Sequence, residues 1–191
     1  MQIELMSDDD EQQRPAELKV RALIIDGRTK EFVAGLPHEV TERTFVVQRV
    51  FRLNDSLPQE SGKIRWQWRR GGWPLIDRLT GKVQSVSLSE FDPEFSLVNW
   101  FRDYAAYCGI SDDGKKSFAV VSQLGRRKPL LKKSLVSSPE STGDICPVPV
   151  WNRTPGRVTF EPKNETKFTY TVRSRAVDVV VEDDDQQASD E

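Results

Sequence analysis

Apolar and polar residues follow a two-residue period along much of the middle of this chain. The clearest case is a pair of apolar runs, 104–110 and 118–124, which flank the sequence Ser111-Asp112-Asp113-Gly114. A glycine after polar turn residues supplies the positive φ that a tight reversal needs. We therefore predict a β-hairpin over 104–124, with Cys108 and the tyrosines of its first strand in the core.

Alternating, β-branched and aromatic segments on both sides of this hairpin predict further strands. They lie at 18–25, 31–34, 44–53, 64–69, 129–136, 157–160 and 167–181, with two short strands around a turn at 77–81 and an extended segment at 146–151. Residues 35–38, Gly-Leu-Pro-His, are expected to break the strand before them. A helix competes with strands at one place, 93–107, where apolar residues have mixed spacing.

Eight to ten short strands separated by turn residues predict an all-β, antiparallel fold, with at most one short helix. A sandwich and a barrel both fit this pattern. We divide the chain into a disordered acidic N-terminal segment (1–17), a single β-rich domain (18–181) and a disordered acidic C-terminal tail (182–191). A β-rich domain of this length can bury a sizeable core.

The segment 72–131 resembles one blade of a β-propeller. Its sequence IDRLTGKV is similar to a blade strand with a DxxTG turn, and GISDDGKKSFAVV is similar to the strand pair around an S-x-DGK turn in the repeats of periplasmic propeller proteins. The resemblance covers about a third of the chain. It implies a blade-like arrangement of the local strands.

The two ends of the chain differ from its middle in charge. Residues 1–17 contain six acidic residues and one arginine, and 182–191 contain six acidic residues and no base. The middle has 27 Lys and Arg against 18 Asp and Glu, so a chain of net charge −2 contains a body of +9. Acidic tails on a basic body fit an anion-binding surface, neutralisation within the chain, or solubility alone.

The sequence contains no motif for catalysis, a metal or a cofactor. His38 is the only histidine and is expected in an exposed loop, and one histidine with two distant cysteines lacks the paired spacing of a zinc site. No nucleophile elbow or phosphate-binding loop occurs. Asp112 and Asp113 fit turn chemistry better than acid–base chemistry. We expect no cofactor, and a binding domain is favoured over an enzyme.

Cys108 and Cys146 form a candidate disulfide, although two cysteines do not decide the compartment. The apolar runs are much shorter than the roughly 20 residues that cross a bilayer. The N-terminus is acidic where a secretory signal is basic and then apolar. The chain as written therefore indicates a cytoplasmic protein, or an exported one if a leader lies upstream, and its oligomeric state stays open.

Two basic stretches are candidate partner-binding sites. They comprise Arg65, Arg69 and Arg70, which are interleaved with tryptophans, and Arg126, Arg127 and Lys128, which follow the hairpin. If Trp66 and Trp68 turn inward, the arginines form the solvated face of a sheet. If the tryptophans turn outward, they can stack on nucleic-acid bases while the arginines contact phosphates. The regular alternation favours the first arrangement.

We therefore expect a binding or accessory domain that recognises a macromolecular partner, most simply a protein, through a sheet face or edge. The alternative is a domain that binds nucleic acid or another polyanion through the basic body, with the acidic tails competing for that surface.

Overall fold

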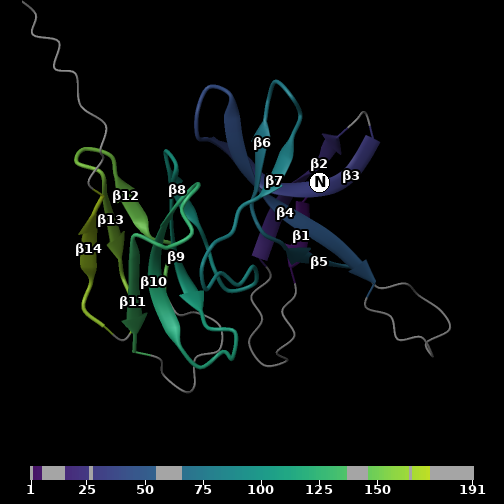
Figure 1. Ribbon diagram of the computed structural model, residues 1–191. Coiled ribbons are helices and arrows are strands. Elements are labelled where there is room, and N and C mark those ends of the chain that lie inside the picture. The colour runs from purple at the N-terminus through teal and green to yellow at the C-terminus, as the bar shows by residue number, and fades with distance from the viewer. Residues whose placement is uncertain are drawn as a thin grey trace, which may run out of the picture.

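The computed structural model describes residues 2–5, 16–25, 28–54, 66–136, 146–163 and 165–172. These residues form strands and no helix, and the strands make three antiparallel sheets (Figure 1). The predicted all-β, antiparallel class is thus confirmed. The competing helix over 93–107 is wrong, because strands begin at Asn99 and Tyr104 and turns precede them.

The first sheet is organised around one long strand. Its strands are β1 (Gln2–Leu5), β2 (Ala16–Ile25), β3 (Arg28–Glu39), β4 (Thr44–Asn54), β5 (Trp66–Arg70), β6 (Pro74–Asp77) and β7 (Val83–Ser85). They are ordered β1-β2-β3-β4-β6-β7, and β5 also pairs with β4. β5 and β6 use different ends of β4, and the link between them, Gly71 and Gly72, continues the pairing through hydrogen bonds with Arg49.

The second and third sheets are smaller. The second contains β8 (Asn99–Phe101), β9 (Tyr104–Ile110), β10 (Ser117–Gln123) and β11 (Leu131–Leu135) in the order β11-β10-β9-β8. The third contains β12 (Val150–Asn152), β13 (Arg157–Phe160) and β14 (Phe168–Thr171) in chain order. The predicted hairpin over 104–124 is confirmed as β9 and β10, and Gly114 in its turn has φ of 69°.

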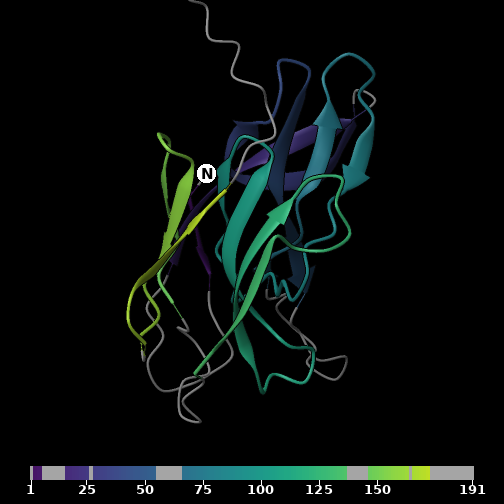
Figure 2. The ribbon, with the colours of Figure 1, turned by 60° about the vertical axis from the view of Figure 1, so that its left-hand side comes forward.

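The second sheet lies between the other two (Figures 1 and 2). Ala105 and Tyr107 of β9 pack in one core with Val46 of the first sheet. The alternate residues, Ala106 and Cys108, pack in another core with Val158 and Phe160 of the third sheet. Because both faces of β9 are buried, its sequence is a continuous apolar run rather than an alternating one.

Two sequence-based predictions of local structure are wrong. β3 does not end before residues 35–38; it continues to Glu39 through a register shift between Ala34 and His38, where Gly35 has φ of 71°. A bulge of this kind takes up extra residues without ending the strand. His38 accordingly lies on a strand and is half-buried instead of exposed in a loop.

The blade-like arrangement of 72–131 is also not formed. β6 and β7 belong to the first sheet, whereas β8–β11 form the second. The DxxTG and S-x-DGK turns each make a local hairpin, as expected, but a turn does not determine which hairpins share a sheet.

Strand pairing in the N-terminal part starts before residue 18. β1 pairs with β2 from Gln2–Lys19 to Leu5–Ala16, so both strands include residues of the segment 1–17. Residues 6–15 and the C-terminal tail 182–191 lie outside the described residues. The proposed domain boundaries therefore stay predictions.

Candidate functional site

Two of the arginines interleaved with tryptophans, Arg69 and Arg70, lie on β5. Arg69 forms an ion pair with Glu94, with 2.5 Å between Nη1 and Oε1. Burial lowers the pKa of Arg70, while the charge of Glu94 acts in the opposite direction. Trp68 is buried against Ala34 and Val50, so this tryptophan turns inward as the alternation predicts. Arg65 lies outside the described residues.

The second basic stretch, Arg126 to Lys128, forms the exposed turn between β10 and β11. Gly125 has φ of 77°, and the Arg126 N–H donates to Gln123 O at 3.1 Å, so the chain reverses directly after β10. None of the three basic side chains forms an ion pair with a carboxylate of the described residues. Their positive charge is thus presented to solvent.

A groove of about 480 Å³ connects this turn to the first sheet. We call it the edge groove; it is lined by Leu75, residues 84–88 and residues 123–127. Its apolar residues, Leu75, Val86, Leu88 and Leu124, are partly buried against the core between the first and second sheets. Arg126 and Arg127 also line the groove, whereas Arg69 and Arg70 are not among its lining residues. The edge groove is therefore lined by part of the second basic stretch and by neither described arginine of the first.

One edge of β7 is open along this groove. β7 is the last strand in the order of the first sheet, and on that side no described strand pairs with it. Asp77 N donates to Lys82 O at 3.0 Å, so Asp77 and Lys82 are a hydrogen-bonded pair. From this pair along the antiparallel β6–β7 ladder, non-hydrogen-bonded and hydrogen-bonded pairs follow in turn. In that alternation the N–H and C=O groups of Val83 and Ser85 face away from β6. No strand among the described residues uses these groups, so they can pair with an added strand.

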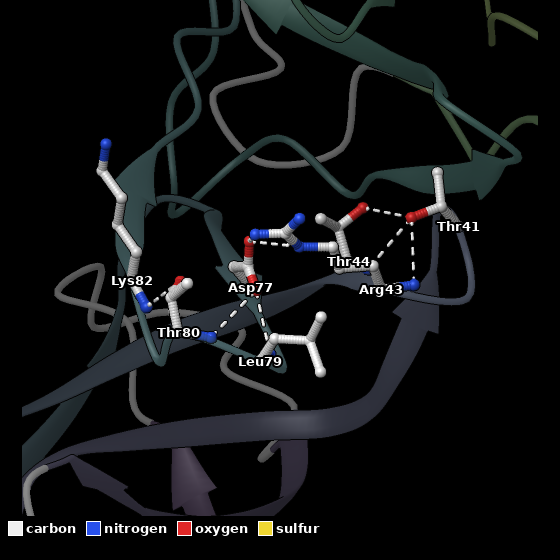
Figure 3. Close-up of polar contacts among 7 residues, drawn as sticks. All are labelled: Thr41, Arg43, Thr44, Asp77, Leu79, Thr80 and Lys82. Atoms are coloured by element: carbon white, nitrogen blue, oxygen red, sulfur yellow. Dashed lines mark hydrogen bonds and ion pairs between the residues drawn. The ribbon is translucent and has the colours of Figure 1, made fainter.

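The turn before β7 is held by Asp77 (Figure 3). Its carboxylate accepts hydrogen bonds from the N–H groups of Leu79 at 2.9 Å and Thr80 at 3.1 Å, and from Arg43 Nε at 2.7 Å. The Arg43 hydrogen bond is the largest cause that lowers the pKa of Asp77 to about 2. Gly81, with φ of 67°, completes the predicted turn. These contacts fix the direction in which β7 leaves β6.

The two cysteines are joined in the structure. Cys108 on β9 and Cys146, which precedes β12, form a disulfide with their Cα atoms 6.3 Å apart. Both residues belong to the core between the second and third sheets. The described residues contain no group of three or more His, Cys, Asp or Glu side chains that could hold a metal ion. No helix in the described part of the chain is long and apolar enough to cross a membrane.

The sequence alone did not predict that residues 84–88 would line a groove. In residues 83–88 polar residues separate Val83, Val86 and Leu88, a pattern that fits a short strand but does not predict that its outer edge would lack a described neighbour. The sequence placed Leu124 at the end of the predicted hairpin, but it did not indicate which residues Leu124 would contact. Residues 85 and 126 line one groove because Val86 and Leu124, which lie close to them in the sequence, pack against the same core.

Comparison with protein-family models, with curated proteins and with solved structures finds no match to this chain.

Proposed function

We propose that this protein is a binding module that takes up an extended, acidic segment of a partner protein as an added strand on β7. The observation that carries the proposal is that Arg126 and Arg127 line the same groove as Ser85, whose main-chain groups lie on the open edge of β7. In strand addition, main-chain hydrogen bonds supply affinity and the alternating side chains supply specificity.

The lining of the edge groove matches the two faces of such a strand. Side chains on one face would contact the apolar residues of the groove, among them Leu75 and Leu124. Acidic side chains would meet Arg126 and Arg127, whose planar guanidinium groups can bind a carboxylate through two parallel hydrogen bonds. A segment that alternates apolar and acidic residues fits both requirements.

A polyanion is supported less well than an acidic peptide. Nucleic-acid binding needs many cations on one continuous surface. Several cations are instead engaged locally: Arg69 pairs with Glu94, Lys132 with Glu90 and Lys133 with Glu165. Binding of an oligonucleotide is therefore the competing outcome of the test below.

The test uses a blocked eight-residue peptide that alternates Val and Glu, with a Val–Lys peptide as its charge-reversed control. We expect the Val–Glu peptide to bind and to shift the amide resonances of Val83 and Ser85 in ¹⁵N-correlated NMR spectra. The Val–Lys peptide should bind at least about ten-fold more weakly, because its cations face Arg126 and Arg127.

Two variants separate the backbone and charge contributions. Ser85→Pro removes an N–H that faces away from β6, so it should preserve the β6–β7 ladder and abolish peptide binding. Arg126→Gln with Arg127→Gln should weaken binding about ten-fold or more, whereas Lys115→Gln with Lys116→Gln at the hairpin tip should not.

Equal binding of both peptides, or unchanged binding by folded Ser85→Pro, would contradict the proposal. Binding of a single-stranded oligonucleotide in place of the peptide would favour the polyanion alternative.

A further inference from the structure

A second cavity, of about 420 Å³, lies where parts of all three sheets meet. We call it the junction cavity. Its lining comes from the end of β3, from the β8–β9 turn and from β12: His38, Glu39, Val40, Asn99, Trp100, Phe101, Arg102, Trp151 and Arg153. Its volume is in the range of small-molecule sites. Apart from His38, none of these residues was singled out by the sequence.

Aromatic rings form one wall of the junction cavity. The ring centroids of Phe101 and Trp151 are 5.4 Å apart, and both side chains are half-buried, so each retains solvent-accessible surface. Trp151 is held in place because its indole N–H donates to Asn99 O at 2.9 Å. The amide of Asn99 in turn donates to Pro149 O at 2.8 Å. The wall is therefore preformed.

Two arginines supply positive charge at this wall. The Arg102 guanidinium lies over the Phe101 ring, 5.4 Å from its centroid. Arg153 is exposed, and neither arginine forms an ion pair with a carboxylate of the described residues. The one carboxylate that lines the cavity, Glu39, is paired with Arg78 at 2.5 Å. Both guanidinium groups are thus available to an anion.

The backbone at Arg102 is held in an unfavourable conformation. Its φ is 53°, in the left-handed region that residues other than glycine seldom adopt. His38 Nε2 lies 2.7 Å from Arg102 O; since a carbonyl only accepts, Nε2 carries the hydrogen and donates it. The His38 ring also stacks on Trp100, with centroids 5.9 Å apart. Strained residues of this kind concentrate at ligand sites.

We propose that the junction cavity binds an acidic sugar unit, a pyranose ring that carries a carboxylate. The C–H face of the ring would lie on Phe101 and Trp151, because the negative face of an aromatic ring attracts weakly positive C–H groups. The carboxylate would accept hydrogen bonds from Arg102 and Arg153. Ring hydroxyls would donate to Glu39. This inference is independent of peptide binding in the edge groove, which shares no lining residue with the junction cavity.

Four probes test the assignment by titration followed through tryptophan fluorescence and NMR: glucuronate, glucose, acetate and adenosine monophosphate. We expect glucuronate to bind and to shift the indole N–H resonance of Trp151. Glucose lacks the charge and acetate lacks the ring, so each should bind at least about ten-fold more weakly. Binding of adenosine monophosphate with no binding of glucuronate would overturn the sugar assignment in favour of a nucleotide.

The variants are chosen to keep the fold. Arg102→Gly removes the guanidinium and suits the positive φ at this position, so it should fold normally and lose glucuronate affinity about ten-fold or more. Arg153→Gln should give a similar loss, and Lys115→Gln, which removes one charge from a residue that does not line the cavity, should give none. Absence of glucuronate binding to the full chain, or unchanged affinity in both folded arginine variants, would overturn the proposal.

Discussion

Asp77 is a residue whose ionisation state affects the local structure on which the edge groove depends. Its carboxylate accepts two turn N–H groups and pairs with Arg43, and these contacts hold its pKa at about 2. The pKa of an unperturbed aspartate is about 3.9. Because the folded state has the lower pKa, the ionised carboxylate stabilises the fold above about pH 4, and this contribution is lost as the pH falls through about 2.

We expect Asp77→Asn to lower stability at pH 7. Asparagine can still accept the turn N–H groups, but it loses the charge that Arg43 binds. The difference from the unmodified protein should shrink between about pH 4 and about pH 2, where Asp77 itself becomes protonated. Urea unfolding at a series of pH values measures this difference.

Asp112→Asn provides the matched control, since Asp112 is exposed in the β9–β10 turn. It forms no hydrogen bond or ion pair with another described residue. A destabilisation by Asp77→Asn that is the same at pH 2 and pH 7 would show that the ionised carboxylate is not its cause.

At the scale of elements, β9 organises the molecule because it has a core on each face. Tyr107 faces the first sheet, and its hydroxyl donates to Ser89 O at 2.6 Å. Cys108, one residue later, faces the third sheet and is bonded to Cys146. The disulfide ties β9 to the segment that enters β12, across 38 residues of sequence.

Reducing this disulfide should lower the free energy of unfolding by about 3–4 kcal/mol, the chain-entropy estimate for a loop of this length. The fold should persist under mild conditions, because the surrounding core includes Val158 and Phe160, both fully buried. Denaturant unfolding of the oxidised protein, the reduced protein and the Cys108→Ala, Cys146→Ala double variant provides the measurement. Two thiols that react with maleimide in unreduced, unfolded protein would show that the bond is not formed.

At the scale of the whole molecule, the net charge of −2 does not show that the ends of the chain are acidic and its middle is basic. Deleting 182–191 removes six acidic residues and changes the formal net charge from −2 to +4. Long-range attraction between an acidic ligand and the basic body should then increase. The position of the tail is not needed for this expectation, which depends on charge alone.

Deletion of 182–191 should therefore strengthen binding of the Val–Glu peptide several-fold at about 50 mM salt, with little effect at about 300 mM, where charges are screened over a shorter distance. A full-length variant with its six tail acids changed to Asn and Gln should behave like the deletion. Identical affinities at low salt would mean that the tail does not compete for the ligand. A single-stranded oligonucleotide titrated in parallel tests the polyanion alternative in the same way.

The predictions that succeeded depend on residues close together in the sequence. The β9–β10 hairpin follows from its two apolar runs and Gly114, and the β6–β7 turn follows from Asp77 and Gly81. The wrong predictions concern segments whose local sequence is compatible with more than one structure. Residues 35–38 can end a strand or form a bulge, and they form a bulge here because β3 continues along β4 as far as Glu39.

The all-β class, the turns and the burial of β9 could be predicted from the sequence, because strand period and turn chemistry act over a few residues. The three-dimensional packing was needed to show that β7 is an edge strand, that Arg126 and Ser85 line one groove, and that His38, Arg102 and Trp151 line one cavity. These arrangements depend on how sheets stack. Stacking is set by the shapes of cores assembled from distant segments, which a local pattern does not specify.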